Sequence, residues 1–302
     1  MEKAKLKYIL DDLDHYTKSY HVFAKKSSKF TGLVKWVEDV FPKLVLDKLV
    51  ESFSAETQIN VLGVGSGSGE MDSKMAASIK TRFKSVRNVV VEPGEKQLEK
   101  YRSLVESKKS EFEGIEFDLR QLGIDEYRAL EGNHSSKYHF INAIQSLYYA
   151  DDFNDTIRYL YDCLEEGGIL LITIISDISG SWRLWNHFPR LQDIIGPYFC
   201  VQHLRQGLSS HDIPFHDIPF DENHQRAHVD ITSCFEKGSK EGKLLVDFIS
   251  QIVDFHGSAS PEFYKEVVDY IGSEECSERK EDGTILYNND WDAVVAQKPI
   301  SK

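Results

Sequence analysis

A glycine-rich stretch offers the first residues whose spacing could serve chemistry. The segment VLGVGSGSGEMD, residues 61–72, joins a short apolar run to four alternate glycines and then to an acidic pair. Glycine lacks a Cβ, so such a turn between a strand and a helix lets a ligand approach backbone N–H groups closely. A dinucleotide binds there through its pyrophosphate, and S-adenosylmethionine binds there through its amino-acid and ribose parts. The glycine spacing alone leaves both ligands open.

Acidic residues near the loop favour the second ligand. Glu70 and Asp72 open the expected helix, where they would repel a pyrophosphate but suit a donor that carries an ammonium and a sulfonium. Ordinary charge at a helix N-terminus is the alternative explanation. Glu92 follows the next apolar run, 23 residues after Gly69, which leaves room for one helix. A carboxylate there can accept hydrogen bonds from both ribose hydroxyls. NAD sites also place an acidic residue at this point, and a solvent-exposed strand end would have the same sequence pattern.

The segments that must position these residues alternate between short apolar runs and longer stretches with helical spacing. Short apolar runs predict strands at 59–64, 88–92, 114–119, 138–143 and 167–175, and the last run is apolar on both faces, as a covered central strand should be. Helical spacing predicts helices between them, at 70–80 and 95–107, after 119, and from Phe153 to Leu164. This β-α alternation predicts an α/β fold with a mostly parallel sheet wound on both faces.

The flanking regions differ from this core. The first 55 residues have helical spacing, and helices return at 244–255 and 261–271. The repeated unit HDIPFHDIPF at 211–220 contains two prolines and predicts an ordered loop or an edge strand. Residues 283–297 predict a closing pair of strands around an Asn-Asn-Asp turn. We expect a single domain, 1–302, with an N-terminal helical lid at 1–55, a donor-binding core at 56–195 and a substrate-side region at 196–302 that completes the sheet.

Composition limits the partners. The chain of 302 residues has a formal net charge of −13, which disfavours nucleic acid and anionic membranes because both need a basic surface. The four cysteines are far apart, and the N-terminal residues contain no apolar stretch of signal-peptide length. These features predict a cytoplasmic protein with reduced thiols, and a monomer is the simplest expectation.

A histidine-rich segment raises the question of a metal. His211, His216, His224 and His228 occur within eighteen residues, together with several carboxylates. Zinc could use such ligands, but the spacing matches no metal motif. We therefore expect a polar surface loop and no metal.

Three segments in order carry a family resemblance. The segments VLGVGSGSGEMD, VVVEPGEKQLEKY and FINAIQSLYYADD resemble the histamine N-methyltransferases, which are S-adenosylmethionine-dependent small-molecule methyltransferases. The likeness extends to HYTKSYHVF, SWRLW, ITSCFEKGSKEGKLLVDF and ILYNN, and so covers most of the chain. It implies a seven-stranded Rossmann-like methyltransferase fold, with S-adenosylhomocysteine as the spent donor and a small imidazole or amine as the acceptor.

The resemblance also implies site residues. The donor residues fall on the loop and on two neighbouring strand ends, at Gly65, Gly67, Gly69, Glu92, Gln97 and Ile144. The acceptor residues fall on aromatic and amide positions, at Tyr16, Tyr20, Gln145, Tyr148, Tyr149, Trp182, Trp185, Phe255 and Asn289. Gln145 and Asn289 are the expected catalytic pair. Core packing is the alternative for the aromatic residues, and a hairpin turn is the alternative for Asn289.

These residue types suit methyl transfer to nitrogen. Transfer from a sulfonium is an in-line displacement that needs a nitrogen lone pair aimed at the methyl group. An imidazole with a pKa near ~6.5 is largely neutral at pH 7, so no strong base is required and positioning supplies most of the rate. Neutral amides can orient ring nitrogens without adding charge, and aromatic walls can stabilise a cationic product.

Two departures from the family bear on the acceptor. The family has a glutamate, expected to bind the ammonium of histamine, where this chain has Lys29. A cation there would favour an acceptor that carries a carboxylate, such as histidine or carnosine, unless Lys29 faces solvent and another acid serves. The tryptophans of SWRLW are three residues apart, where the family has four, so one aromatic wall is displaced. A non-catalytic donor-binding regulator is the remaining alternative.

Overall fold

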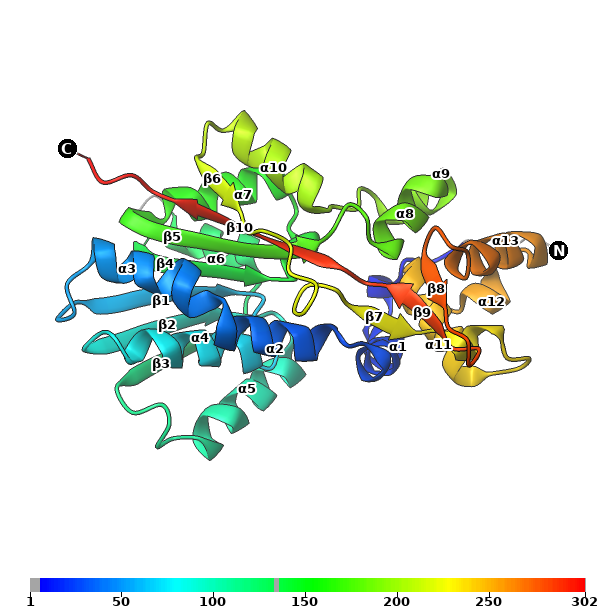
Figure 1. Cartoon of the computed structure of the whole chain (residues 1–302), viewed down its shortest axis with the longest axis horizontal. Coiled ribbons are helices and arrows are strands. Elements are labelled where there is room, and N and C mark those ends of the chain that lie inside the picture. Colours follow the sequence, from blue (N-terminus) through cyan, green and yellow to red (C-terminus); the bar gives the residue numbers. More distant parts are fainter. Residues whose placement is uncertain (1–5, 133–135, 302) are drawn as a thin grey trace. The chain divides into compact units, whose positions relative to one another are not determined.

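The computed structural model describes residues 6–132 and 136–301 (Figure 1). The chain forms two compact units, each assembled from separate segments. The first, here called the sheet unit, comprises Leu33–Ile174, Val201–Phe220 and Asp292–Lys302. The second, the helical unit, comprises Met1–Gly32, Ile175–Cys200 and Asp221–Trp291. These boundaries cut across the expected lid, core and substrate-side regions, and whether the chain functions as one domain stays a prediction.

A seven-stranded sheet forms the centre of the sheet unit, with the strand order β3-β2-β1-β4-β5-β10-β6. The pairs from β3 to β5 are parallel, and β6 is antiparallel to β10. The strands are β1 (Gln58–Val64), β2 (Ser85–Val91), β3 (Ile115–Arg120), β4 (Tyr138–Ile144), β5 (Leu164–Ile175), β6 (Phe215–Asp217) and β10 (Trp291–Gln297). The predicted α/β fold is therefore confirmed.

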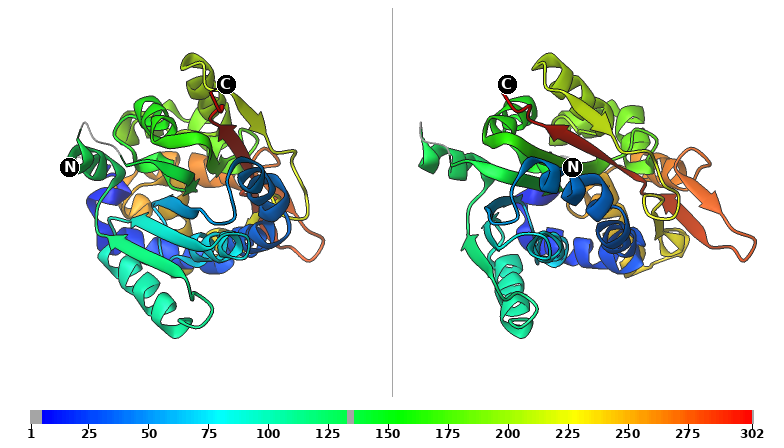
Figure 2. Two further views of the ribbon diagram at one scale, coloured as in Figure 1. Left: turned by 90° about the vertical axis from the view of Figure 1, so that its left-hand side faces the viewer. Right: turned by 60° about the vertical axis from the view of Figure 1, so that its left-hand side comes forward.

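Helices cover both faces of this sheet (Figures 1 and 2). One face carries α3 (Asp47–Ser52), α4 (Glu70–Lys80) and α5 (Glu95–Ser107), and the other carries α6 (Ile124–Glu131), α7 (Phe153–Asp162) and α10 (Val201–Ser210). The chain also forms α2 (Lys29–Asp39), a π-helical turn η2 (Pro42–Leu46) and a 3-10 turn η3 (Leu147–Tyr149). The double layer buries β5 from Ile169 to Ile175, which explains its continuous apolar run.

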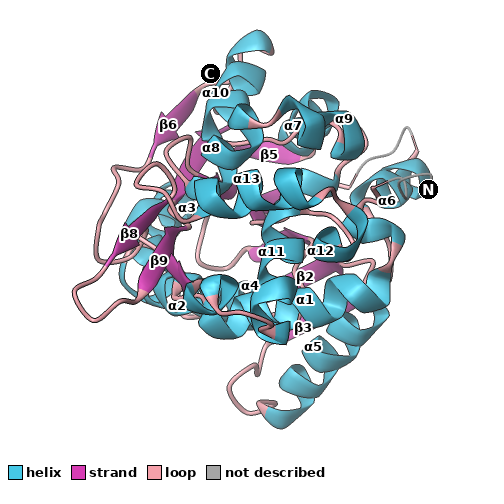
Figure 3. Ribbon diagram, turned by 90° about the vertical axis from the view of Figure 1, so that its right-hand side faces the viewer, coloured by secondary structure: helices cyan, strands magenta, loops and turns pink. Residues whose placement is uncertain are grey.

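The helical unit contains a three-stranded sheet with the order β7-β9-β8, whose neighbours are antiparallel (Figure 3). Its strands are β7 (His228–Asp230), β8 (Ser277–Arg279) and β9 (Ile285–Asn288). Its helices are α1 (Leu13–Lys26), α8 (Gly180–His187), α9 (Pro189–Ile195), α11 (Lys240–Ser250), α12 (Phe255–Ser258) and α13 (Pro261–Ile271), with 3-10 turns η1 (Ile9–Asp11) and η4 (Thr232–Phe235). Buried side chains of α11, α13 and β9 form one hydrophobic cluster at its centre.

The structure corrects the expected closing hairpin. β9 and β10 flank the Asn-Asn-Asp segment, but they belong to different sheets. The carboxylate of Asp290 accepts the N–H of Ala227, and the N–H of Asn289 bonds to the carbonyl of the same residue. These bonds to a separate segment take the place of a tight turn. Helix α10 was not predicted, and the predicted helix at 244–255 divides into α11 and α12, since Gln251 takes up a left-handed backbone conformation.

Candidate active site

The glycine loop connects β1 to α4 and is fixed against the end of β4. Gly65 has a φ of 61°, and a Cβ on it would lie 2.5 Å from the Cβ of Ser146. The hydroxyl of Ser146 donates to the carbonyl of Val64 at 2.6 Å. Position 65 therefore requires glycine both for its conformation and for the close approach of Ser146.

This loop lies at a topological switch point. β1 pairs with both β2 and β4, although the chain forms β2 and β3 before β4. In open α/β sheets, ligands bind beyond the carboxyl ends of the strands where the strand order reverses. The ends of β1 and β4, tied by Ser146, mark that place in the sheet unit.

Glu92 is the acidic residue that completes the loop. One carboxylate oxygen accepts the N–H of Gly67 at 2.8 Å, and the other accepts the N–H of Gly94 at 2.8 Å. Burial raises the pKa of Glu92, and these two N–H groups oppose that rise. Each oxygen keeps a further lone pair, so the carboxylate could still accept one hydrogen bond from each of two ribose hydroxyls. Gln97 lies in the first turn of α5, and its backbone N–H bonds to the carbonyl of Gly94 at 3.0 Å.

Asp72 has a different role from the one expected of it. Its carboxylate is 2% exposed and accepts bonds from the phenol of Tyr101 and from the amides of Asn88 at 2.6 Å and Asn142 at 2.8 Å. Asp72 thus clamps the start of α4 to β2, β4 and α5 instead of turning toward a ligand. Sequence reasoning missed this network, although asparagines inside apolar strands were a visible signal of it.

Gly69 and Glu70 lie where the loop joins α4. Glu70 is exposed and accepts the hydroxyl of Ser68 at 2.6 Å. Gly69 immediately precedes α4, and the ring of Tyr101 occupies the space where its Cβ would be. The acidic pair is therefore divided between one solvent-facing carboxylate and one internal clamp.

Gln145 follows Ile144 at the carboxyl end of β4. Its φ of 54° is left-handed, which is uncommon for a residue with a side chain and occurs often at functional sites. The side-chain amide donates to the hydroxyl of Thr173 at 3.3 Å, and its oxygen accepts the phenol of Tyr148 at 3.0 Å. The amide is thus held in one orientation beside the donor loop. Tyr149 ends the same 3-10 turn.

In the helical unit, Tyr16 and Tyr20 lie on one face of α1. Their rings stack with centroids 5.9 Å apart, and both contact the ring of Phe248 on α11. His15 fixes this helix, because its Nε2 lies 2.9 Å from the buried carboxylate of Asp247. The predicted pair is therefore brought together on a helix that is anchored to α11.

Lys29 and Asn289 also come together in the helical unit. The hydroxyl of Ser27 accepts the backbone N–H of Lys29 at 3.1 Å and the side-chain amide of Asn289 at 3.3 Å. Asn289 is 2% exposed. Burial lowers the pKa of Lys29 to about 7, while the negative charge of Asp290 opposes that shift. Lys29 is partly buried and interacts electrostatically with Asp290, so it does not simply extend into solvent.

The remaining aromatic residues are more deeply buried. Trp185 is 1% exposed and stacks on Tyr198 at 4.7 Å, and its indole nitrogen has no hydrogen-bond partner among the described residues. Phe255 is fully buried in the hydrophobic cluster of the unit. Trp182, on the same helix as Trp185, is partly exposed. A role in acceptor binding stays a prediction for all three.

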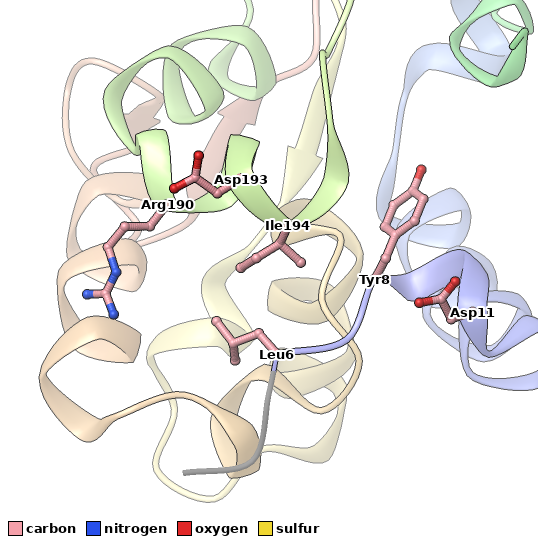
Figure 4. A pocket seen from close by; sticks show the side chains of 6 residues that line it. All are labelled: Leu6, Tyr8, Asp11, Arg190, Asp193 and Ile194. Atoms are coloured by element: carbon pink, nitrogen blue, oxygen red, sulfur yellow. The ribbon is translucent and has the colours of Figure 1, made fainter.

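A cavity of about 460 Å³ lies in the helical unit and is lined by Leu6, Tyr8, Asp11, Arg190, Asp193 and Ile194 (Figure 4). The side chains of Leu6 and Ile194 point toward one another across it. The guanidinium of Arg190 lies over the ring of Phe263 at 4.3 Å. None of these lining residues belongs to the predicted acceptor set.

The histidine-rich segment forms ordinary structure. His224 bonds to the carboxylate of Asp221 at 2.7 Å, and His216 lies on edge strand β6. Within residues 6–132 and 136–301, no three histidine, cysteine or acidic side chains form a group that could hold a metal. Over the same described ranges, no helix is long and apolar enough to cross a membrane.

The strand order, the glycine loop at the switch point and the buried Glu92 bonded to that loop are those of an S-adenosylmethionine-dependent methyltransferase of class I. Residues 36–212 match the family described as a methyltransferase domain. A putative methyltransferase from Bacillus halodurans shares the fold, with a TM-score of 0.51 and 14% identity over 85% of this chain and 99% of that one.

Two curated relatives narrow the class to a family. A histamine N-methyltransferase of Danio rerio is 31% identical over 97% of this chain and 99% of its own length. Carnosine N-methyltransferase 2 of Gallus gallus is 29% identical over 94% of this chain and 87% of its own length. The chain belongs to the histamine N-methyltransferase-like family. It is an enzyme of the methyltransferase class, so the non-catalytic alternative is set aside.

Proposed function

We propose that the enzyme transfers the methyl group of S-adenosylmethionine to an imidazole or amine nitrogen of a small, histamine-like molecule. The observation that carries this proposal is the left-handed, doubly hydrogen-bonded Gln145 at the end of β4. A neutral amide in a fixed orientation suits a nucleophile that is itself neutral. A strained backbone conformation persists only where the surrounding structure enforces it, and such conformations cluster at functional sites.

The donor set fits a sulfonium better than a phosphate. Gly67 has a φ of 57°, and in the described part of the chain no atom lies within 4 Å of the position its Cβ would take. The loop is thus open on that side, and the Gly67 N–H is bonded to the Glu92 carboxylate. The donor supplies an activated methyl group and leaves as S-adenosylhomocysteine. We propose that Gly65, Gly67, Gly69, Glu92, Gln97 and Ile144 hold it.

The chain's own residues then have to position the acceptor. Gln145 can present its amide to a ring nitrogen while Thr173 and Tyr148 hold it in place. In the helical unit, Asn289 is a neutral amide that donates to the Ser27 hydroxyl, and its part in catalysis is proposed separately. Correct positioning of two reactants can supply about 7–11 kcal/mol of a barrier, so a strong base at the reacting nitrogen is not required.

A second candidate acceptor is an imidazole that carries a carboxylate, such as histidine or carnosine. It is favoured by the lysine at position 29 and by the similarity to the chicken carnosine N-methyltransferase. The two candidates differ in the charge of the acceptor's tail and share the same ring chemistry. They are therefore alternatives within one proposed reaction.

The test is radiolabelled methyl transfer to histamine, histidine, carnosine and an aromatic amine, with wild-type enzyme and two variants. Gln145→Glu keeps the size of the side chain but adds a charge, and we expect a loss of about 10²-fold in kcat/KM, or ~2.7 kcal/mol of positioning and electrostatics. The matched control is Gln202→Glu on α10, whose side chain is exposed. Donor binding by calorimetry with no turnover of any acceptor would refute the proposed reaction.

A further inference from the structure

One buried carboxylate of the helical unit bonds to two elements that carry predicted acceptor residues. Asp247 lies on α11 and is 3% exposed. One of its oxygens accepts the backbone N–H of Phe255 at 2.8 Å, and the other lies 2.9 Å from Nε2 of His15. An ionised carboxylate only accepts hydrogen bonds, so Nε2 of His15 carries the hydrogen of the second bond. The carboxylate therefore has one donor on each side.

Each of these donors is part of the predicted acceptor set or adjoins it. His15 directly precedes Tyr16 on α1, and Phe255 is the first residue of α12. Helix α11 contacts both α1 and α12 (Figure 3). The residue that follows Asp247, Phe248, has its ring centroid 6.0 Å from that of Tyr16. The carboxylate thus lies where the spacing between Tyr16 and Phe255 is decided.

The connection between α11 and α12 has an unusual backbone. Gln251 and Asp254 are both left-handed, with φ of 59° and 42°, although neither is a glycine. The N–H of Ile252 bonds to the carbonyl of Asp247 at 3.1 Å, which turns the chain back onto the end of α11. This turn returns the N–H of Phe255 to the carboxylate of Asp247. Left-handed residues with side chains cluster at functional sites, where the surrounding structure enforces them.

We propose that Asp247 is a positioning residue for the methyl acceptor. Its carboxylate fixes the distance between α1 and the start of α12, so loss of either bond shifts Tyr16 relative to Phe255. Asp247 acts through these two residues and needs no contact of its own with the acceptor. This inference rests on the proposed function, because it takes Tyr16 and Phe255 as residues that contact the acceptor.

Variants of His15 test one of the two bonds and leave the carboxylate in place. His15→Leu removes the donor to Asp247, whereas His15→Gln keeps an N–H donor on a side chain of similar reach. His15 is partly exposed, so neither variant alters the hydrophobic core. The matched control is Lys18→Leu, which places a leucine at an exposed position of the same helix.

Methyl transfer to histamine and to carnosine gives KM and kcat, and calorimetry with S-adenosylhomocysteine gives the donor Kd. We expect His15→Leu to raise the acceptor KM about tenfold, or ~1.4 kcal/mol, while kcat and the donor Kd stay within about twofold of wild type. A merely stabilising role would instead reduce the amount of folded enzyme, which lowers kcat at constant KM. His15→Gln should restore most of the affinity, and Lys18→Leu should keep the wild-type values.

Hydrogen exchange measures the link between the two helices without any acceptor. The N–H of Phe255 should exchange at least about threefold faster in His15→Leu than in wild type, because a carboxylate that has lost one donor is less firmly held. The exchange rate in His15→Gln should return toward the wild-type value. Lys18→Leu should leave it unchanged.

Each outcome has a defined meaning. An unchanged acceptor KM in His15→Leu, or a His15→Gln variant that is equally impaired, would overturn the inference. A raised KM without faster exchange at Phe255 would also overturn it, since the effect would then be confined to α1. Absence of methyl transfer by the wild type to any acceptor would refute the proposed reaction, and the exchange rate at Phe255 would still decide whether Asp247 links α1 to α12. The two failures are thus distinguishable.

Discussion

Two glycines of the donor loop should respond differently to the same substitution. Gly65 and Gly67 both have left-handed backbones, with φ of 61° and 57°. A methyl group on Gly65 would meet the Cβ of Ser146 at 2.5 Å, whereas a methyl group on Gly67 would point into open space in the described structure. Gly65→Ala should therefore damage the fold, and Gly67→Ala should damage donor binding.

The structure gives a magnitude for each variant. A left-handed backbone costs a residue with a Cβ about 1–2 kcal/mol, and both variants incur this cost. The contact with Ser146 adds about 1–3 kcal/mol of overpacking for Gly65→Ala alone. We therefore expect Gly65→Ala to lose ~2–5 kcal/mol of unfolding free energy, and Gly67→Ala ~1–2 kcal/mol.

Urea unfolding and calorimetry with S-adenosylhomocysteine measure the two effects. Gly67→Ala should weaken donor binding at least about tenfold, or ~1.4 kcal/mol, because its methyl group occupies the open side of the loop. Adding Ser146→Gly to Gly65→Ala should recover part of the stability by removing the contact, less ~1 kcal/mol for the lost bond to Val64. Equal stability losses in the two single variants would refute the packing argument. Wild-type donor affinity in Gly67→Ala would refute the placement of the donor.

Three further outcomes are expected. Tyr101→Phe should cost about 1.5–3 kcal/mol in urea unfolding, because it removes a donor to the buried Asp72 carboxylate, and unchanged stability would contradict the clamp. Asp247→Asn should cost a similar ~1.5–3 kcal/mol by weakening the bond to His15, with faster hydrogen exchange in α1 as the local readout. Lys29 has a folded-state pKa of about 7 against an ordinary 10.5, so the unfolded chain binds more protons between these values and wild-type stability should rise with pH across them. Lys29→Met should unfold at a higher urea concentration than wild type at pH 7, and this difference should shrink toward pH 10; a constant difference would contradict the lowered pKa.

The sequence was most informative where local pattern and fold agree. The helix predicted at 70–80 and that predicted at 95–107 match α4 and α5 residue for residue, since each begins after a glycine and carries a buried apolar stripe. The strand at 167–175 was recognised because both of its faces are buried. The glycine loop was recognisable because its four glycines lie within seven consecutive residues, 63–69.

The less predictable features depend on residues distant in sequence. Asp72 could not be identified as a clamp, because its donors come from three other elements. The hairpin expected at Asn289 was wrong because the turn signal was local, whereas Ala227 decides the path of the chain there. The surroundings of Lys29 were also hidden, since Asp290 lies 261 positions away in the chain. The roles of the predicted acceptor residues stay predictions.

The segmented make-up of the helical unit constrains how the protein can be synthesised. The middle strand of its sheet, β9, ends at Asn288, so this sheet cannot close until the chain as far as Asn288 has left the ribosome. The sheet unit has strands β1 to β5 complete by Ile175 and could begin to fold much earlier. Loss of the last twenty residues would remove β9 and β10 from the two sheets at once. A truncation before Ile285 should therefore disrupt both sheets at once.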